Sequence, residues 1–167
     1  IQGVLQVQYQ NLGSVKTNGI EFESKTVFND NFSASFGVSL NEGREDDGYL
    51  DSLSPDHAKI SLSWISDSGR LRWNTISTLM ESSRSTLSPV CGRSGVCSPA
   101  QETAGRVTLD TYLNFDLTEK VNIKFGVRNL TDKKYWDYPT IAGQAAGTAD
   151  EYLMPGRNMS FSIRYSL

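Results

Sequence analysis

The sequence predicts an all-β protein: an antiparallel up-and-down segment of a transmembrane β-barrel with about eight strands. Three observations lead to this fold class. Apolar and polar residues alternate with period two, which is the pattern of strands that have one apolar and one polar face. Short and long connections between these stretches alternate along the chain, as in outer-membrane barrels. Charged residues keep to the polar parity, because a charge facing lipid at the bilayer midplane would cost about 2–4 kcal/mol.

Eight alternating stretches define the predicted strands. They cover residues 4–11, 19–28, 32–40, 60–64, 71–79, 107–117, 121–128 and 159–167. The short polar turns centre on Asn29, Asp67 and Thr118, and no helix is predicted. The long connections follow Leu40, Leu79 and Tyr138. The last strand reaches the final residue, and because an open apolar edge invites pairing with another chain, this favours a closed barrel.

The charged residues of these strands lie opposite the apolar row. They are Glu21, Glu23, Lys25, Arg70, Arg72, Arg106, Asp110, Asp116, Lys124, Arg128 and Arg164. We interpret the charged row as the lining of a lumen and the apolar row as the lipid-facing surface. Two other structures would give the same alternation. A soluble β-sandwich or lipocalin-like binding module buries its apolar row, and a free-standing eight-stranded outer-membrane barrel closes on its own side chains.

Length and composition exclude several other classes. The 167 residues are expected to form one unit, 1–167, and a net charge of −3 gives no reason to expect nucleic acid as a partner. No apolar run reaches the roughly 18 residues that a transmembrane helix requires. The sequence begins without methionine or a signal peptide, so we expect either a piece of a larger protein or the product of signal removal.

Cys91 and Cys97 lie close together in the stretch SPVCGRSGVCSP, which is rich in glycine, serine and proline. We predict that they form a local disulfide in an oxidising compartment, with two free thiols as the alternative. Two cysteines cannot complete a four-ligand zinc site, and the single histidine, His57, is distant in sequence.

Other chemical sites are not expected. The acidic segment EDDGYLD lacks the spacing of a calcium loop, and no serine stands with a histidine in a nucleophile motif. A lumen lining explains the charged row without catalysis, so the sequence predicts no enzyme, no metal and no cofactor. Tyr49, Tyr138 and Tyr152 lie in the long connections, where they would contact a ligand or pack within their loops.

Several short motifs resemble the C-terminal third of TonB-dependent outer-membrane receptors, the 22-stranded transporters of Gram-negative bacteria. They are NLG at 11–13, GIE at 19–21, PDH at 55–57, VRNLTDKKY at 127–135, PGRN at 155–158 and RYSL at 164–167. They span nearly the whole chain in the order found in that family. The terminal residue departs from the usual phenylalanine, since the chain ends in Leu167, which is still apolar.

This resemblance implies uptake of an iron complex, such as a siderophore or haem, or of a similar scarce nutrient. The chain would supply barrel wall and outer loops in the cell outer membrane. Its partners would be outer-membrane lipid, a plug domain and further strands absent from this sequence, TonB acting through the missing N-terminal part, and the barrel-assembly machinery. The segments KKYWDYPTIAG and PGRN are most similar to the haem and haemoglobin receptor branch.

The resemblance also implies roles for individual residues. His57 is a candidate ligand contact, although a histidine at the base of a loop often only forms a hydrogen bond. The alternating row at the end of the chain would be read by the barrel-assembly machinery. That row consists of Phe161, Ile163, Tyr165 and Leu167.

Overall fold

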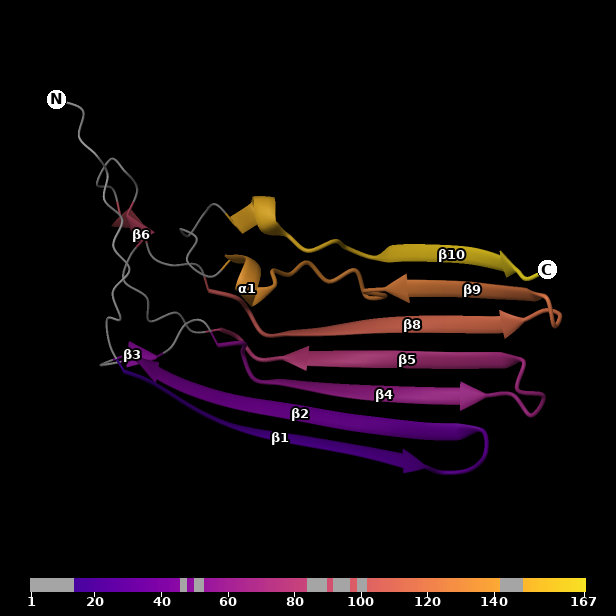
Figure 1. Ribbon diagram of the computed structural model, residues 1–167. Coiled ribbons are helices and arrows are strands. Elements are labelled where there is room, and N and C mark those ends of the chain that lie inside the picture. The colour runs from indigo at the N-terminus through magenta and orange to yellow at the C-terminus, as the bar shows by residue number, and fades with distance from the viewer. Residues whose placement is uncertain are drawn as a thin grey trace.

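The computed structural model describes residues 14–45, 48–49, 53–83, 90–91, 97–98, 102–141 and 149–167. Most of these residues form one antiparallel sheet whose long strands follow one another in chain order (Figure 1). The long strands are β1 (Val15–Val27), β2 (Phe32–Glu45), β4 (His57–Ile65), β5 (Leu71–Met80), β8 (Arg106–Asp116), β9 (Val121–Arg128) and β10 (Asn158–Tyr165). The predicted all-β, up-and-down architecture is confirmed. The first predicted strand, 4–11, lies outside the described residues.

Three short strands and two short helical turns complete the described part. The short strand β3 (Gly48–Tyr49) pairs with the end of β2, and β6 (Val90–Cys91) pairs with β7 (Cys97–Ser98) in a separate hairpin. No helix was predicted, and this is wrong for the last connection. A single turn α1 (Tyr138–Ile141) and a 3-10 turn η1 (Ala149–Tyr152) lie there. No helix among the described residues is long and apolar enough to cross a membrane.

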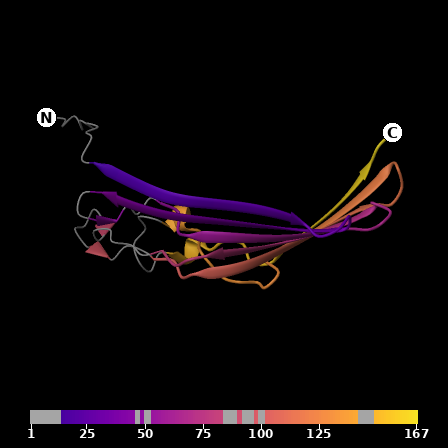
Figure 2. The ribbon, with the colours of Figure 1, turned by 90° about the horizontal axis from the view of Figure 1, so that it is seen from below.

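The sheet is a single curved and twisted layer (Figure 2). Its register keeps the apolar residues of neighbouring strands on one face. One such row of direct register partners runs across five strands through Trp64, Trp73, Leu113, Phe125 and Phe161. Phe125 is 41% exposed and Phe161 is 64% exposed, so these rings do not meet in a sealed core. The described residues therefore do not form the two-layer core that a soluble sandwich requires.

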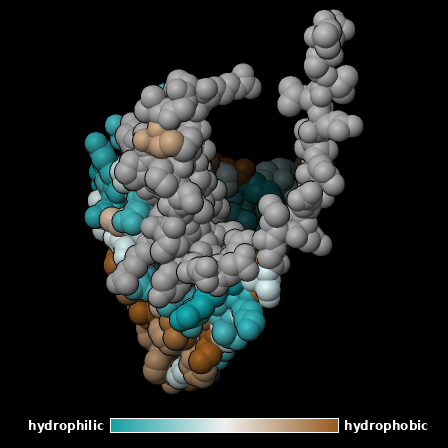
Figure 3. All heavy atoms as spheres, turned by 90° about the vertical axis from the view of Figure 1, so that its left-hand side faces the viewer, coloured by the Kyte–Doolittle hydropathy of each residue, from teal (hydrophilic) through white to brown (hydrophobic). Residues whose placement is uncertain are grey.

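Polar groups on this apolar face are satisfied within the sheet. The Trp73 indole nitrogen donates to the Thr111 hydroxyl at 2.8 Å, and the Thr75 and Thr111 hydroxyls are 3.0 Å apart. An unsatisfied donor would be costly in a hydrocarbon environment, so this pairing suits a surface that faces lipid. In Figure 3, which looks onto the long-loop end, hydrophobic residues gather at the lower side of the view, where β1 and β2 lie in Figure 1.

Local polar residues form the three short turns. The Asn29 carboxamide oxygen accepts from the Asn31 and Phe32 amides at 3.0 and 2.8 Å, and Gly69 adopts φ 68°. The Thr118 hydroxyl accepts from the Val121 amide at 3.0 Å. Neighbouring turns are also joined to each other. Asn31 donates to the Ile65 carbonyl and the Asp67 carboxylate, and Arg70 donates to the Asp116 and Leu117 carbonyls.

Candidate functional site: the inner face and the outer rim

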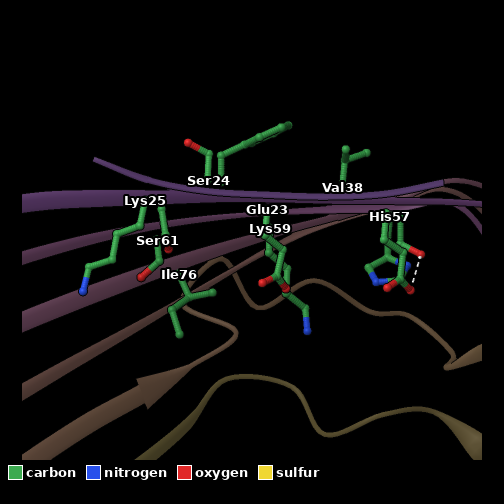
Figure 4. A pocket seen from close by; sticks show the side chains of 13 residues that line it. Glu23, Ser24, Lys25, Val38, His57, Lys59, Ser61 and Ile76 are labelled. Atoms are coloured by element: carbon green, nitrogen blue, oxygen red, sulfur yellow. Dashed lines mark hydrogen bonds between the residues drawn. The ribbon is translucent and has the colours of Figure 1, made fainter. Parts of the chain in front are cut away.

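The charged row predicted to line a lumen lies on the face opposite the apolar row. Glu23, Lys25 and Lys59 project from one side of the strands, whereas Ser24 and Val38 project from the other (Figure 4). Glu23, Lys25 and Lys59 line a hollow of about 680 Å³ over β1, β2, β4 and β5. Gly37 lies in the register between Glu23 and Lys59, and a Cβ there would meet only ordinary contacts, the nearest at 3.8 Å. The missing side chain at Gly37 contributes to the depth of this hollow.

The hollow carries both signs of charge. Glu21 and Glu23 supply carboxylates, and Lys25 and Lys59 supply ammonium groups. Within the part of the chain that the structure describes, none of the four forms an ion pair. Glu21 accepts only a long hydrogen bond, 3.5 Å, from the Ser39 hydroxyl. These charges are thus free to contact another segment of a larger protein, and no described group of three or more His, Cys, Asp or Glu residues is arranged to hold a metal.

His57 lies at the start of β4 and lines the same hollow. Its Nδ1 atom is 3.2 Å from the Pro55 carbonyl oxygen, so a proton on Nδ1 would be donated to that carbonyl. In that tautomer Nε2 remains an acceptor on the inner face. The direct register partner of His57 on β5 is Met80. The position of His57 fits either a ligand contact or a histidine that fixes the base of its loop, and its ligand role stays a prediction.

The motif VRNLTDKKY forms the base of the last outer connection. Asn129 is buried and has φ 49°, a left-handed conformation that turns the chain away from the path of β9. Its amide donates to Asp110 at 2.7 Å, and its side chain exchanges hydrogen bonds of 2.9 Å with the backbone of Lys133. A longer bond of 3.4 Å reaches the Pro155 carbonyl. Asn129 therefore fixes both the exit from β9 and the approach to β10.

Asp132 joins the same two segments. It also has a positive φ, 55°, and its carboxylate accepts from the Arg157 amide at 2.7 Å. Gly156 permits this contact, since a Cβ at that position would lie 2.6 Å from the Asp132 carboxylate oxygen. We call the group Asp110, Asn129, Asp132, Gly156 and Arg157 the rim clasp. It explains physically why NLTD and PGR occur together in this sequence.

Replacing Gly156 with alanine is expected to weaken the rim clasp, because the new methyl group must displace the Asp132 carboxylate. The loss of the bond to Arg157 should cost about 1–2 kcal/mol. In the full-length protein, the temperature at which the folded barrel loses its shifted gel mobility should fall by several degrees. Gly37→Ala is the matched control, since its Cβ meets nothing closer than 3.8 Å. Equal transition temperatures for the two variants would contradict the role of Gly156.

Arg106 forms the second set of contacts at the outer rim. It lies at the first position of β8, and the register through Ser39, His57 and Met80 places it on the inner face. Its guanidinium donates to the Asp137 carboxylate at 2.7 Å and to the Trp136 carbonyl at 2.9 Å. It also lies over the Tyr135 ring, 4.5 Å from the centroid. The Arg106 side chain is only 7% exposed, whereas that of Asp137 is 39% exposed, so the pair is buried on the arginine side only.

Most of the sequence matches one known family. The family model described as TonB dependent receptor-like, beta-barrel, matches residues 1–130. The chain belongs to the TonB-dependent receptor family. Its location is therefore the outer membrane of a Gram-negative bacterium, as predicted. No curated protein sequence matches the chain.

Three solved structures of TonB-dependent receptors and transporters share the fold. The copper transporter OprC has a TM-score of 0.75 at 19% identity, over 93% of this chain and 23% of that protein. The pyoverdine outer membrane receptor FpvA of Pseudomonas aeruginosa PAO1 gives 0.71 at 18%, over 92% and 22%. The ferric yersiniabactin uptake receptor FyuA of Yersinia pestis gives 0.68 at 21%, over 94% and 24%. The chain thus spans about a quarter of the length of these proteins.

Within this TonB-dependent receptor segment, the predicted tyrosine contacts lie on three different elements. Tyr49 is in β3, and nothing is described of its side chain. Tyr138, in α1, is 3% exposed, which favours packing inside its loop over contact with a ligand. Tyr152 ends η1 and is half-buried. Sequence reasoning did not identify the ion pair between Arg106 and Asp137, which are 31 positions apart with no motif that links them.

The predicted disulfide lies in the small hairpin of β6 and β7. Cys97 is disulfide-bonded, and its direct register partner is Cys91, the other cysteine of the chain. We propose that these two residues form the bridge. Mass spectrometry of the non-reduced protein should find no thiol that can be alkylated in this hairpin, and two after reduction. Two alkylated thiols without reductant would rule the bridge out.

Proposed function

We propose that this chain is part of the barrel of a receptor that imports a scarce nutrient complex across the outer membrane, with energy supplied through TonB. The chain contributes barrel wall and outer loops. The observation that carries the proposal is the two-sided sheet, with an exposed apolar row on one face and unpaired charges of both signs on the other. Such a wall needs lipid outside and a polar filling inside.

The class of compound is proposed from the named relatives. FpvA is described as bound to pyoverdine, FyuA as a ferric yersiniabactin uptake receptor and OprC as a copper transporter. We propose an iron complex of the siderophore or haem type, and copper as a second candidate. The haem branch stays a prediction. In the two segments that suggested it, KKYWDYPTIAG and PGRN, the residues Tyr135, Trp136, Asp137 and Arg157 take part in holding the rim together.

The inner face supports a plug domain as the immediate partner. Glu21, Glu23, Lys25 and Lys59 border a hollow without ion pairs among the described residues, and a plug segment with complementary charges would fill it. We propose TonB as a partner of the missing N-terminal part. We also propose that the chain has no enzymatic activity of its own, in keeping with a family of receptors and transporters.

The barrel-assembly machinery is the proposed partner of the terminal strand. β10 presents its apolar row, Phe161, Ile163 and Tyr165, at exposures of 61–64%. Leu167 follows the strand and is fully exposed. Within the described residues β10 is an edge of the sheet, so its outer hydrogen-bonding groups are available for pairing during assembly.

The function can be tested in the native bacterium by deleting the gene that encodes the full-length protein. Uptake of radioactive iron should be measured separately for a panel of ferric siderophores and haem, and uptake of copper in a parallel series. We expect one compound to lose most of its uptake in the deletion strain and to lose the same uptake when TonB is inactivated. Unchanged uptake of every iron and copper probe would contradict the proposed substrate class, and uptake independent of TonB would contradict the mechanism.

A further inference from the structure

The outer end of β8 lacks a regular neighbour on one side. The outermost register pair between β8 and β9 joins Thr111 to Val127, and β9 ends at Arg128. Beyond it, the Leu130 amide donates to the Leu109 carbonyl at 2.7 Å, while the strand itself extends back to Arg106. The segment after β9 lies in this region: Arg106 contacts Tyr135, Trp136 and Asp137, and Figure 1 shows α1 beside the outer end of β8. We call residues 133–141 the strap.

Arg106 attaches the strap from the inner side of the wall. Three consecutive strap residues contact its guanidinium: Tyr135 through its ring, Trp136 through its carbonyl and Asp137 through its carboxylate. A planar guanidinium can make these three contacts at once, whereas a lysine ammonium cannot. The Arg106 side chain is 7% exposed and that of Asp137 is 39% exposed, so the ion pair is partly shielded from water and is stronger than a fully exposed pair.

Backbone hydrogen bonds and buried apolar side chains also hold the strap. The Thr140 amide donates to the Asp137 carbonyl at 3.0 Å, and the Met154 amide donates to the Tyr135 carbonyl at 3.0 Å. Tyr138 and Ile141 are buried, with Ile141 at 0% exposure, and Ile141 is the largest fully buried side chain described. The rim clasp at Asn129 and Asp132 sets the direction in which the strap leaves β9. Buried apolar contacts and bonded amides are features of a segment that opens rarely.

We propose that the strap is a fixed part of the barrel mouth and that Arg106 is the positioning residue that holds it against the inner side of the wall. An incoming ligand then meets a preformed surface on this side, and it does not have to order the strap on binding. This inference goes beyond the proposed uptake function, because it holds whichever compound is imported.

Hydrogen exchange of the full-length receptor in lipid nanodiscs tests the proposal. In Arg106→Met, the amides of Thr140 and Met154 should exchange at least tenfold faster than in the wild type, while amides in β4 and β5 keep their rates. Arg72→Met is the matched control, since Arg72 also faces inward and pairs with a strand carboxylate, Asp116, at 3.1 Å. Arg72→Met should leave the strap unchanged. A conservative Arg106→Lys variant should give an intermediate rate.

The variant Asp137→Ala removes the partner from the strap without altering a strand. It should also raise the exchange rates of the Thr140 and Met154 amides. If Arg106→Met does not assemble, this variant tests the proposal in its place. Wild-type exchange of both amides in an assembled Arg106→Met receptor would overturn the proposal. So would wild-type exchange in Asp137→Ala when Arg106→Met fails to assemble. Faster exchange spread evenly over β4, β5 and the strap would also overturn it, because that result indicates general destabilisation.

Discussion

Replacing Phe125 with arginine is expected to reduce the amount of assembled receptor in the outer membrane by about tenfold or more. Phe125 lies in the middle of β9, on the apolar row, between its register partners Leu113 and Phe161. Its exposed ring faces lipid, where an arginine near the midplane costs about 2–4 kcal/mol. The measurement is the quantity of full-length protein in purified outer membranes that shows the gel mobility of a folded barrel.

The matched control for this substitution is Ser162→Arg. Ser162 is exposed, lies on the opposite face and has the charged Lys124 as its register partner. A positive charge is therefore tolerated there, and assembly should stay within about twofold of the wild type. Gly126 would be a poor control despite its inward parity, because a Cβ there would lie 2.9 Å from the Ser160 hydroxyl and 3.0 Å from the Tyr112 ring. Equal losses for Phe125→Arg and Ser162→Arg would contradict the assignment of the two faces.

Replacing Asn129 with alanine should destabilise the outer rim more than any other single change in the clasp. The variant loses three side-chain hydrogen bonds. It also places alanine, which has no polar side chain to support a left-handed backbone, at φ 49°. Each lost bond contributes about 1 kcal/mol and the left-handed backbone about 1 kcal/mol more, so we expect a total of about 2–4 kcal/mol. Thermal unfolding of the purified receptor, followed by loss of folded gel mobility, measures the effect.

A second substitution separates the two contributions at this position. Asn129→Gly also loses the side-chain bonds, but glycine adopts a positive φ without strain. Its transition temperature should therefore lie between those of Asn129→Ala and the wild type. If Asn129→Ala unfolds at the wild-type temperature, the clasp does not stabilise the rim. If glycine and alanine give the same loss, backbone strain has no part in it.

Sequence patterning was sufficient to predict the seven long strands that the structure describes and the faces they present. Phe22, Phe36 and Ile60 fall on one parity, and the register pairs Phe36 with Ile60 and Phe22 with Val38 on the same face. Period two reports this directly, because a shift by one residue would turn every apolar side chain to the other side. The short turns were equally clear from Asn29 and Gly69, whose side chain or backbone freedom acts within a few residues.

Features that depend on distant partners could not be predicted in this way. The strand expected to end at Leu40 continues to Glu45, because its polar end pairs with Val15 to Gly19 through backbone hydrogen bonds that leave no apolar pattern. The rim motif marked the family but gave no sign that Asn129 would reach Pro155. The sequence left open whether Tyr138 contacts a ligand or packs within its loop, because its surroundings depend on how the strap folds, and in the structure it is buried.

The direct bonds between successive short turns have a mechanical consequence. Asn31 links its turn to the next through Ile65 and Asp67, and Arg70 continues the series to Asp116 and Leu117. These hydrogen bonds link neighbouring turns at the short-turn end of the sheet, and they resist separation of the strands there. We therefore expect the sheet to spread more easily at its long-loop end than at its short-turn end.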